Sequence, residues 1–268
     1  MALKEKHLND LLPAEKQPEA ETIDTFHAGD FAVVQPKNKG YRSGLDALLL
    51  AAALPTKASG RVADLGAGSG VAGFAALNLH SELRLLSVER NSQMLEFSRR
   101  SIALQGNKQF RDRVQIIEAD VTASGVARIK AGLEPDSVDY VLMNPPYNDG
   151  SARAPNDAMR AEAFLLGEGG IDAWFRTAAS ILRPSGMLAM IYRSENIGEV
   201  VACAQGRFGA LEILPIHSKV EQPAKRIIVR GIRASRAPLS LLPGFIVHDK
   251  NSKFTENAEA IFNGETTL

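Results

Sequence analysis

The sequence predicts an α/β fold with a mostly parallel sheet. Short apolar runs alternate with helical patterns from residue 61 to residue 208, and such alternation is typical of parallel strands joined by right-handed crossovers. The next two apolar runs, residues 211–216 and 226–232, have no helix between them, which favours an antiparallel pair. An apolar content of 45% in 268 residues is enough for the core of one large domain. We therefore expect a seven-stranded sheet that ends in a C-terminal antiparallel strand pair.

The other elements follow from local patterns. Residues 31–34 predict a short strand, and the alanine-rich residues 45–54 predict a core helix. Further on, we expect strands at 61–65, 83–88, 114–117, 140–143 and 187–192, and helices at 71–77, 93–105, 171–182 and 197–208. Apolar residues at helical spacing define the helix at 93–105, and Gly106 ends it. The pair Trp174-Phe175 is expected in the core.

Composition bounds the domain organisation and the class of protein. Residues 1–25 are charged and interrupted by prolines, which predicts a flexible N-terminal arm, and residues 26–268 are expected to form a single domain with basic C-terminal strands and a tail. The single Cys203 excludes an internal disulfide and cysteine-based clusters, and its apolar neighbours predict an inert buried thiol. The histidines lack metal-ligand spacing, so no metal is expected. Since no run reaches the ~18–20 apolar residues of a membrane span and no signal peptide is evident, we expect a cytoplasmic protein.

A glycine-rich turn follows the first strand of the alternating pattern. Residues 64–70 read Asp-Leu-Gly-Ala-Gly-Ser-Gly. Glycines at alternate positions allow positive φ angles and a close approach of a ligand to the backbone. The spacing is neither the G-x-G-x-x-G of dinucleotide-binding folds nor a P-loop. Asp64 would repel a pyrophosphate, so the turn favours a cationic or hydroxyl-bearing ligand.

Acidic residues end the next two predicted strands. Glu89 follows the second strand and is placed to accept both hydroxyls of a ribose. Asp120 follows the third strand and could accept a hydrogen bond from the exocyclic amine of an adenine. Ligands of open α/β sheets lie outside the carboxyl ends of the strands. Together with Asp64, these acids predict a nucleoside-binding edge.

The fourth strand is expected to end in Asn144-Pro145-Pro146-Tyr147. The two prolines fix φ and remove two N–H donors, so the loop is stiff and offers a side-chain amide, bare carbonyls and an aromatic ring. A planar amino group needs acceptors for its two hydrogens and a surface for its ring. The tetrapeptide therefore predicts a site for such a group.

These motifs resemble the S-adenosylmethionine (SAM)-dependent methyltransferases that methylate amino nitrogens and carry an Asn/Asp-Pro-Pro-Tyr/Phe signature. The resemblance implies a Rossmann-like fold with SAM as cofactor. It implies that the cofactor is bound by Arg42, Asp46, Asp64, Gly66, Gly68, Glu89, Asp120, Val121 and Asn144. Asn144 and the Pro145 carbonyl would hold the target amine in a loop stiffened by Pro146, and Tyr147 would stack on the target ring.

Within this group, residues 40–50 and 226–230 are most similar to the bacterial tRNA1(Val) N6-adenine methyltransferases, which act on adenine 37. This similarity implies tRNA as the substrate. The net charge of the chain is zero, but residues 217–253 contain eight Lys or Arg against two acids. Such a segment is either a solvated strand pair or a contact for RNA phosphates, and the candidates for the second role are Lys219, Lys225, Arg226, Arg230 and Arg233.

Other substrates share the tetrapeptide. It also occurs in methyltransferases that act on glutamine in release factors, on guanine N2 in ribosomal RNA and on adenine in DNA. Too few residues lie outside the core for a DNA target-recognition domain, and the first ~25 residues are too few for the helical domain of the glutamine enzymes. A SAM-fold protein that binds RNA without turnover and a nicotinamide dehydrogenase are further alternatives. The intact Asn144 and Tyr147 oppose the first, and the absence of G-x-G-x-x-G opposes the second.

Overall fold

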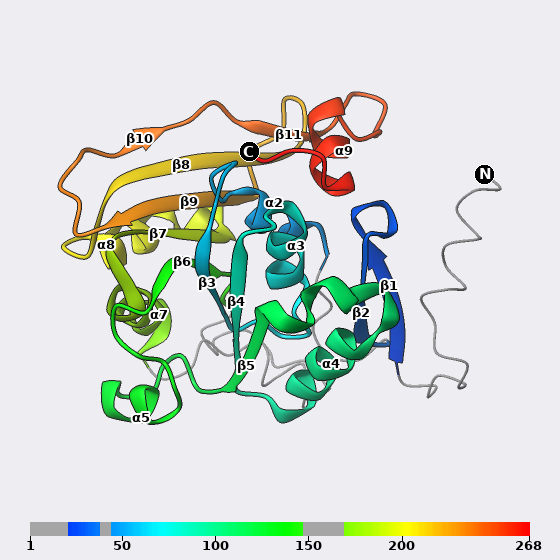
Figure 1. Ribbon diagram of the computed structural model, residues 1–268. Coiled ribbons are helices and arrows are strands. Elements are labelled where there is room, and N and C mark those ends of the chain that lie inside the picture. Colours follow the sequence, from blue (N-terminus) through cyan, green and yellow to red (C-terminus); the bar gives the residue numbers. More distant parts are fainter. Residues whose placement is uncertain (1–20, 38–43, 147–168) are drawn as a thin grey trace.

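The computed structural model describes residues 21–37, 44–146 and 169–268. Its centre is a sheet in which five strands run parallel, in the order β5-β4-β3-β6-β7 (Figure 1). These strands are β3 (Gly60–Leu65), β4 (Leu83–Glu89), β5 (Val114–Glu118), β6 (Val138–Met143) and β7 (Leu182–Arg193). They are the five parallel strands that the alternating pattern predicts.

The C-terminal strands complete the sheet. β9 (Arg226–Arg233) lies between β7 and β8 (Phe208–Lys219) and is antiparallel to both, which confirms the predicted antiparallel pair. Two short strands, β10 (Ser240–Leu241) and β11 (Phe245–His248), pair in parallel with β8, so the sheet has nine strands and not seven. Neither short strand is long enough to show the apolar alternation by which a strand is predicted.

A strand occupies the last part of the segment that we expected to be a flexible arm. β1 (Glu21–Phe26) and β2 (Phe31–Pro36) form an antiparallel hairpin through the short helix η1 (His27–Gly29). Residues 21–25, which we assigned to a flexible arm, are therefore part of a strand. The Asn107 side chain fixes this hairpin, because it accepts from the Ala32 N–H at 3.0 Å and donates to the Ala32 carbonyl at 2.6 Å.

Helices cover both faces of the sheet. One face packs against α2 (Leu45–Ala52), α3 (Val71–Leu79) and α9 (Glu256–Asn263), and the other against α7 (Gly170–Ile181) and α8 (Ile197–Ala204). α4 (Ser92–Ala103) joins β4 to the 3-10 segment η2 (Gln105–Arg113) and packs on β2. The short α5 (Gly125–Lys130) lies between β5 and β6, and the one-turn η3 (Ser194–Asn196) follows β7. The predicted helices match α2, α3, α4, α7 and α8 to within a few residues, whereas α5, α9 and the 3-10 segments were not predicted.

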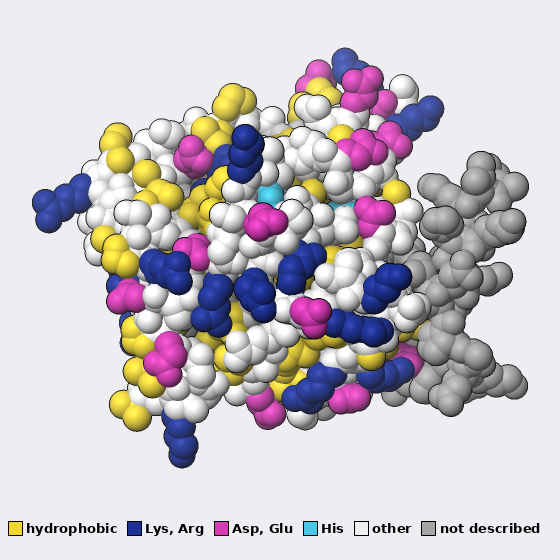
Figure 2. Space-filling model, in the orientation of Figure 1, with side chains coloured by type: hydrophobic (Ala, Val, Ile, Leu, Met, Phe, Trp, Pro, Cys, Tyr) yellow, Lys and Arg dark blue, Asp and Glu magenta, His cyan; other side chains and the backbone are white. Residues whose placement is uncertain are grey.

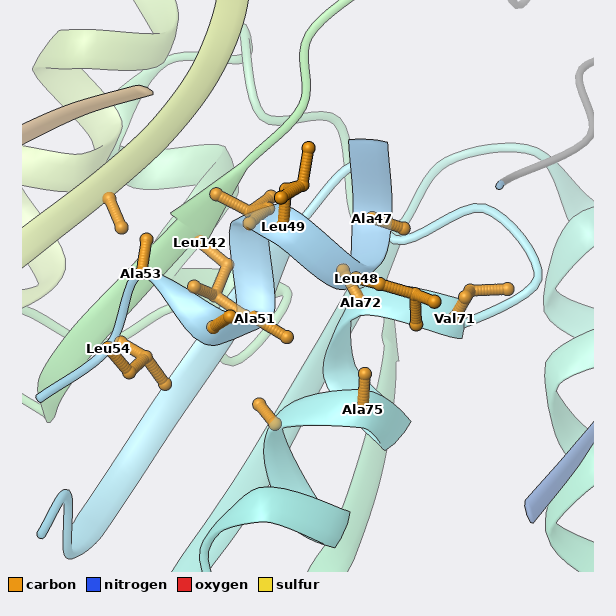
Figure 3. Packing of buried hydrophobic residues seen from close by; sticks show 14 of the residues in the cluster. Ala47, Leu48, Leu49, Ala51, Ala53, Leu54, Val71, Ala72, Ala75 and Leu142 are labelled. Atoms are coloured by element: carbon orange, nitrogen blue, oxygen red, sulfur yellow. The ribbon is translucent and has the colours of Figure 1, made fainter. Parts of the chain in front are cut away.

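Small residues bring α2 and α3 close together. Ala47 and Leu48 of α2 lie against Val71 and Ala72 of α3 (Figure 3), and all four side chains are buried. Alanine side chains let two helix backbones approach closely, and close packing makes the pair rigid. The first turn of α2 and the glycine turn that precedes α3 are therefore held in a fixed relation.

Two single-residue expectations have different outcomes. Trp174 and Phe175 are buried in the core between α7 and the sheet, as we expected. Cys203 on α8 is only half-buried, contrary to the expected buried thiol. Burial, with the nearby Asp172 and Glu199 carboxylates, still raises the pKa of the Cys203 thiol, and a raised pKa keeps a thiol protonated and unreactive.

Candidate cofactor and substrate site

Four predicted site segments meet at one edge of the sheet. β3 pairs with β4 through Leu65 and Val88 and with β6 through Leu65 and Met143. β4 pairs with β5 through Glu89 and Glu118. Because these strands are parallel, the glycine turn after β3, Glu89, Asp120 and the Asn-Pro-Pro segment after β6 all lie beyond the same carboxyl edge.

The glycine turn has left-handed backbone angles that favour glycine. Gly66, Gly68 and Gly70 have φ of 69°, 57° and 98°. A Cβ on Gly66 would lie 2.4 Å from the ring of Trp174, whereas a Cβ on Gly68 would have no neighbour within 4 Å. Gly66 is therefore required for packing inside the protein. Gly68 borders open space, where a ligand can approach the backbone.

The Glu89 carboxylate binds the turn to the end of β4. One oxygen accepts from the Gly68 N–H at 2.8 Å, and the other accepts from the Arg90 and Asn91 N–H groups, also at 2.8 Å. Hydrogen bonds from three backbone N–H groups hold the carboxylate in one orientation. A carboxylate oxygen can accept more than one hydrogen bond, so Glu89 can still receive a ligand hydroxyl.

Asp64 lies beneath the turn and is almost fully buried. One of its oxygens accepts from the Gly73 N–H in the first turn of α3 at 3.0 Å. Burial raises the pKa of Asp64 to about 7, the Gly73 hydrogen bond opposes this rise, and the Glu89 charge adds to it. A cationic ligand above the turn would favour the ionised form of Asp64. The carboxyl group therefore suits a positively charged ligand.

Asp120 is held in its ionised form at the end of β5. Burial opposes ionisation, but hydrogen bonds from the Thr122 N–H and hydroxyl, both 2.7 Å, and the Arg90 guanidinium lower its pKa below the usual value. The Val121 side chain is buried, and its carbonyl accepts from the Thr177 hydroxyl at 2.6 Å. The ionised Asp120 offers an acceptor at the rim of the site.

The segment after β6 is anchored by a residue that the sequence analysis did not single out. Pro145 is buried and Asn144 half-buried. The hydroxyl of Tyr192, on the neighbouring β7, donates to the Pro146 carbonyl at 3.4 Å, and Tyr192 is only 1% exposed. The polar hydroxyl in an otherwise apolar strand was the only signal of this role in the sequence. Tyr147 and Arg42 lie outside the described residues.

The structure pairs two residues to which we assigned different partners. Asp46, in the first turn of α2, accepts from the Arg226 guanidinium at 3.0 Å. Asp46 was expected at the cofactor and Arg226 at RNA. Their ion pair links α2 to the start of β9 at the site edge, so both side chains also have a structural role.

The other candidate RNA contacts do not share one surface. Lys219 donates to the Ser252 hydroxyl at 2.7 Å, and Lys225 is exposed. Arg230 lies 3.0 Å from a Glu212 oxygen with its side chain 19% exposed. Arg233 pairs with Asp136 and the Leu182 carbonyl, at the amino edge of the parallel strands. The basic segment is therefore spread over both ends of its strands.

Two other kinds of feature are absent from the part of the chain that the structure describes. No helix among residues 21–37, 44–146 and 169–268 combines the length and apolarity needed to cross a membrane. The same residues contain no group of three or more His, Cys, Asp or Glu side chains arranged to hold a metal ion.

Comparison with known proteins identifies relatives. The model of the methyltransferase small domain family matches residues 44–219. The chain is 26% identical over 162 residues to a tRNA1(Val) (adenine(37)-N6)-methyltransferase of Tolumonas auensis, and the aligned region covers 60% of this chain and 63% of that protein. It is 31% identical over 195 residues to a ribosomal RNA large subunit methyltransferase G of Alcanivorax borkumensis, covering 73% and 42%. The matched region thus spans less than two thirds of either relative.

Solved structures agree on the fold. A crystal structure of a predicted O-methyltransferase from Agrobacterium tumefaciens is 35% identical, with a TM-score of 0.73, and the match covers 83% of this chain and 98% of that one. A T. thermophilus 16S rRNA N2 methyltransferase in complex with AdoMet and guanosine shares the fold at 16% identity, with a TM-score of 0.52 and coverage of 83% and 53%. The family match covers more than half of the chain, and the topology agrees with it. The chain therefore belongs to the methyltransferase small domain family of SAM-dependent methyltransferases and has their Rossmann-like fold.

Proposed function

We propose that the protein transfers a methyl group from SAM to an exocyclic amino nitrogen of RNA, with N6 of adenine in tRNA as the leading target. The observation that carries this proposal is the Asn144-Pro145-Pro146 segment at the end of β6, directly beside the glycine turn that follows β3. The tRNA1(Val) relative supports adenine in tRNA as the target.

The open space over Gly68 fits a cofactor, because the turn and the carboxylates around it suit a cationic nucleoside. Glu89 would accept from the ribose hydroxyls, Asp120 would accept from the adenine amine, and the Val121 backbone would contact the adenine ring. Gly66, Gly68 and Asp64 would lie along the methionine part, which Arg42 and Asp46 would close. When bound, SAM supplies an electrophilic methyl group on a positively charged sulfur.

The residues of the loop would orient the acceptor nitrogen. An aryl amine shares its lone pair with its ring and is a weak nucleophile. The Asn144 side-chain oxygen and the Pro145 carbonyl can accept its two hydrogens and turn the lone pair towards the methyl group. No strong base is needed before transfer, because the alkylated nitrogen is acidic. Catalysis would then depend on how the protein positions the acceptor nitrogen against the methyl group and on the electrostatics of the site. A base within folded RNA would have to leave its stack to reach the loop.

A second target is favoured by a specific observation. The rRNA methyltransferase G of Alcanivorax shares 31% identity with this chain, a higher value than the tRNA enzyme shows. Guanine N2 in ribosomal RNA presents the same planar amino group as adenine N6. The Asn-Pro-Pro segment can hold either, so the target base has to be found by experiment.

Methylation of defined RNA pools tests the proposal. The purified protein would be incubated with SAM in three separate reactions, which contain unmodified tRNA, ribosomal RNA or release factor. The digested products would be analysed by mass spectrometry. We expect N6-methyladenosine in tRNA. Methyl groups only on guanine N2, on a glutamine side chain or on an oxygen atom would overturn the assignment and name the correct acceptor.

A further inference from the structure

Lys and Arg residues lie at one edge of four adjacent strands, the edge formed by the carboxyl ends of the parallel strands. Beyond β6 the sheet continues β7, β9, β8 and β11. β7 ends at Arg193, β9 begins at Arg226, β8 ends at Lys219 and Lys250 follows β11. Arg193 and Arg226 are register partners, and so are Lys219 and His248, the last residue of β11. Strands lie about 4.8 Å apart, so the four strands that carry these cations span about 15 Å across the sheet.

The row of cations begins beside the substrate loop, by which we mean Asn144, Pro145 and Pro146 after β6. β6 pairs with β7 through Met143 and Met190, so Asn144 and the prolines lie next to the last residues of β7. Tyr192, directly before Arg193, contacts the Pro146 carbonyl. Within residues 21–37, 44–146 and 169–268, Arg193 is therefore the first cation beyond the loop, and Lys219 and Lys250 are further from it.

Hydrogen bonds fix the chain between these cations. The Ser194 N–H donates to the Lys225 carbonyl at 3.3 Å, and its hydroxyl donates to the Ala224 carbonyl at 2.6 Å. Lys219 donates to Ser252, which holds the turn after β11. The turns that present the cations are therefore ordered before any ligand arrives, and preorganised contacts lose less entropy on binding.

The acids at this edge neutralise only part of the row. Asp46 pairs with Arg226 at 3.0 Å, and Glu221 is exposed in the turn between β8 and β9. Arg193 pairs with Glu195 at 3.1 Å, but the Glu195 side chain is 70% exposed, and an exposed pair of this kind is weak. The Asp249 carboxylate accepts from the Asn251 and Lys253 N–H groups and is directed to its own turn. A phosphate can therefore replace the exposed carboxylate beside Arg193.

The opposite edge of the same strands is different. There Arg183 of β7 pairs with Asp139 at 2.9 Å, and Arg233 of β9 pairs with Asp136. On the face shown in Figure 2, Lys and Arg side chains gather in a band across the middle, with Asp and Glu beside them. Cations are thus found elsewhere on the protein, but among the described residues only the carboxyl-edge row starts at the substrate loop.

We infer that the row formed by Arg193, Arg226, Lys219 and Lys250, with the exposed Lys225, is a track for the sugar–phosphate backbone of a single nucleic-acid strand whose target base enters the Asn144 loop. The inference rests on the proposed function, because it needs a nucleic-acid substrate. Phosphate contacts position a substrate without reading its sequence. The track therefore places the base, and the pocket selects it.

The test uses a variant in which Arg193, Lys219, Lys225 and Lys250 are replaced by Ala, leaving Arg226 in its pair with Asp46. The matched control replaces Arg183 and Arg236, exposed cations near the opposite edge, by Ala. Affinity for a fluorescent single-stranded RNA and for tRNA would be measured between about 50 and 300 mM salt. Each lost contact should reduce the salt slope by about 0.7, so we expect a reduction of two to three in the track variant and no change in the control.

Circular dichroism and SAM titration show whether the track variant is folded. A folded variant whose salt slope and KM for RNA equal those of the wild type overturns the track. If the variant misfolds, Lys225→Glu with Lys250→Glu, both at exposed positions, gives the same test by charge reversal. The proposed function fails separately, when the wild-type protein methylates no RNA at all.

Discussion

Replacing Glu89 by Ala should weaken SAM binding and loosen the glycine turn at the same time. The Glu89 carboxylate accepts three backbone N–H groups, one of them from Gly68. Loss of its charge-assisted bonds to the ribose should cost about 1.5–3 kcal/mol, which is about 10- to 150-fold in Kd. The three orphaned N–H groups should also lower the free energy of unfolding, by about 1–3 kcal/mol if water does not replace the carboxylate.

Calorimetric titration with SAM and thermal unfolding without ligand would separate the two effects. Glu118→Ala is a matched control, because Glu118 is the register partner of Glu89 on β5 and is exposed. The control should leave both quantities near wild type. If Glu89→Ala kept the wild-type Kd for SAM, Glu89 would not contact the cofactor, whatever happened to stability.

Three further predictions concern residues around the same edge. Burial raises the pKa of Asp64 to about 7 from 3.8, so the protonated form of Asp64 stabilises the cofactor-free fold. The stability of the wild-type protein should therefore fall as pH rises from about 4 to 7. If Asp64→Asn showed the same dependence of Tm on pH as the wild type, this prediction would be refuted. Tyr192→Phe should cost about 1 kcal/mol of stability and lower kcat with an unchanged Kd for SAM. The control Tyr140→Phe, within β6, should leave kcat intact. Equal kcat values in the two variants would remove Tyr192 from the positioning of the loop. Gly68→Ala should fold at a cost of about 1–2 kcal/mol for its positive φ but bind SAM poorly, and Gly66→Ala should lose more stability, since its Cβ would meet a ring at 2.4 Å; tight SAM binding by a folded Gly68→Ala would place the cofactor elsewhere.

The sequence was sufficient to predict the central strands because each of them is a local apolar run. Parallel strands have their carboxyl ends at one edge, so the strand-end positions of Glu89, Asp120 and Asn144 were enough to predict that they lie together. β10 and β11 were missed because strands of two and four residues are too short to show a pattern. β1 was missed because its polar residues resemble the charged arm before it.

Side-chain pairing could not be predicted in the same way. Asp46 and Arg226 are 180 residues apart in sequence and meet only because α2 packs beside the start of β9. The distribution of the basic residues depends on strand direction: β9 runs antiparallel to β7, which places Arg226 at the site edge and Arg233 at the opposite edge. A count of charges along the chain contains neither fact.

The central claim is that Asn144 holds the acceptor amine, and Asn144→Ala tests it most directly. Single-turnover methylation of the natural RNA substrate would be measured with SAM saturating, together with the Kd for SAM. Asn263→Ala, at the end of α9, is the control for an Asn-to-Ala change outside the site. We predict a Kd for SAM within a few-fold of wild type and a rate at least about 100-fold lower, because the lost interaction is made mainly in the transition state. A rate near wild type in the Asn144→Ala variant would contradict the proposed mechanism.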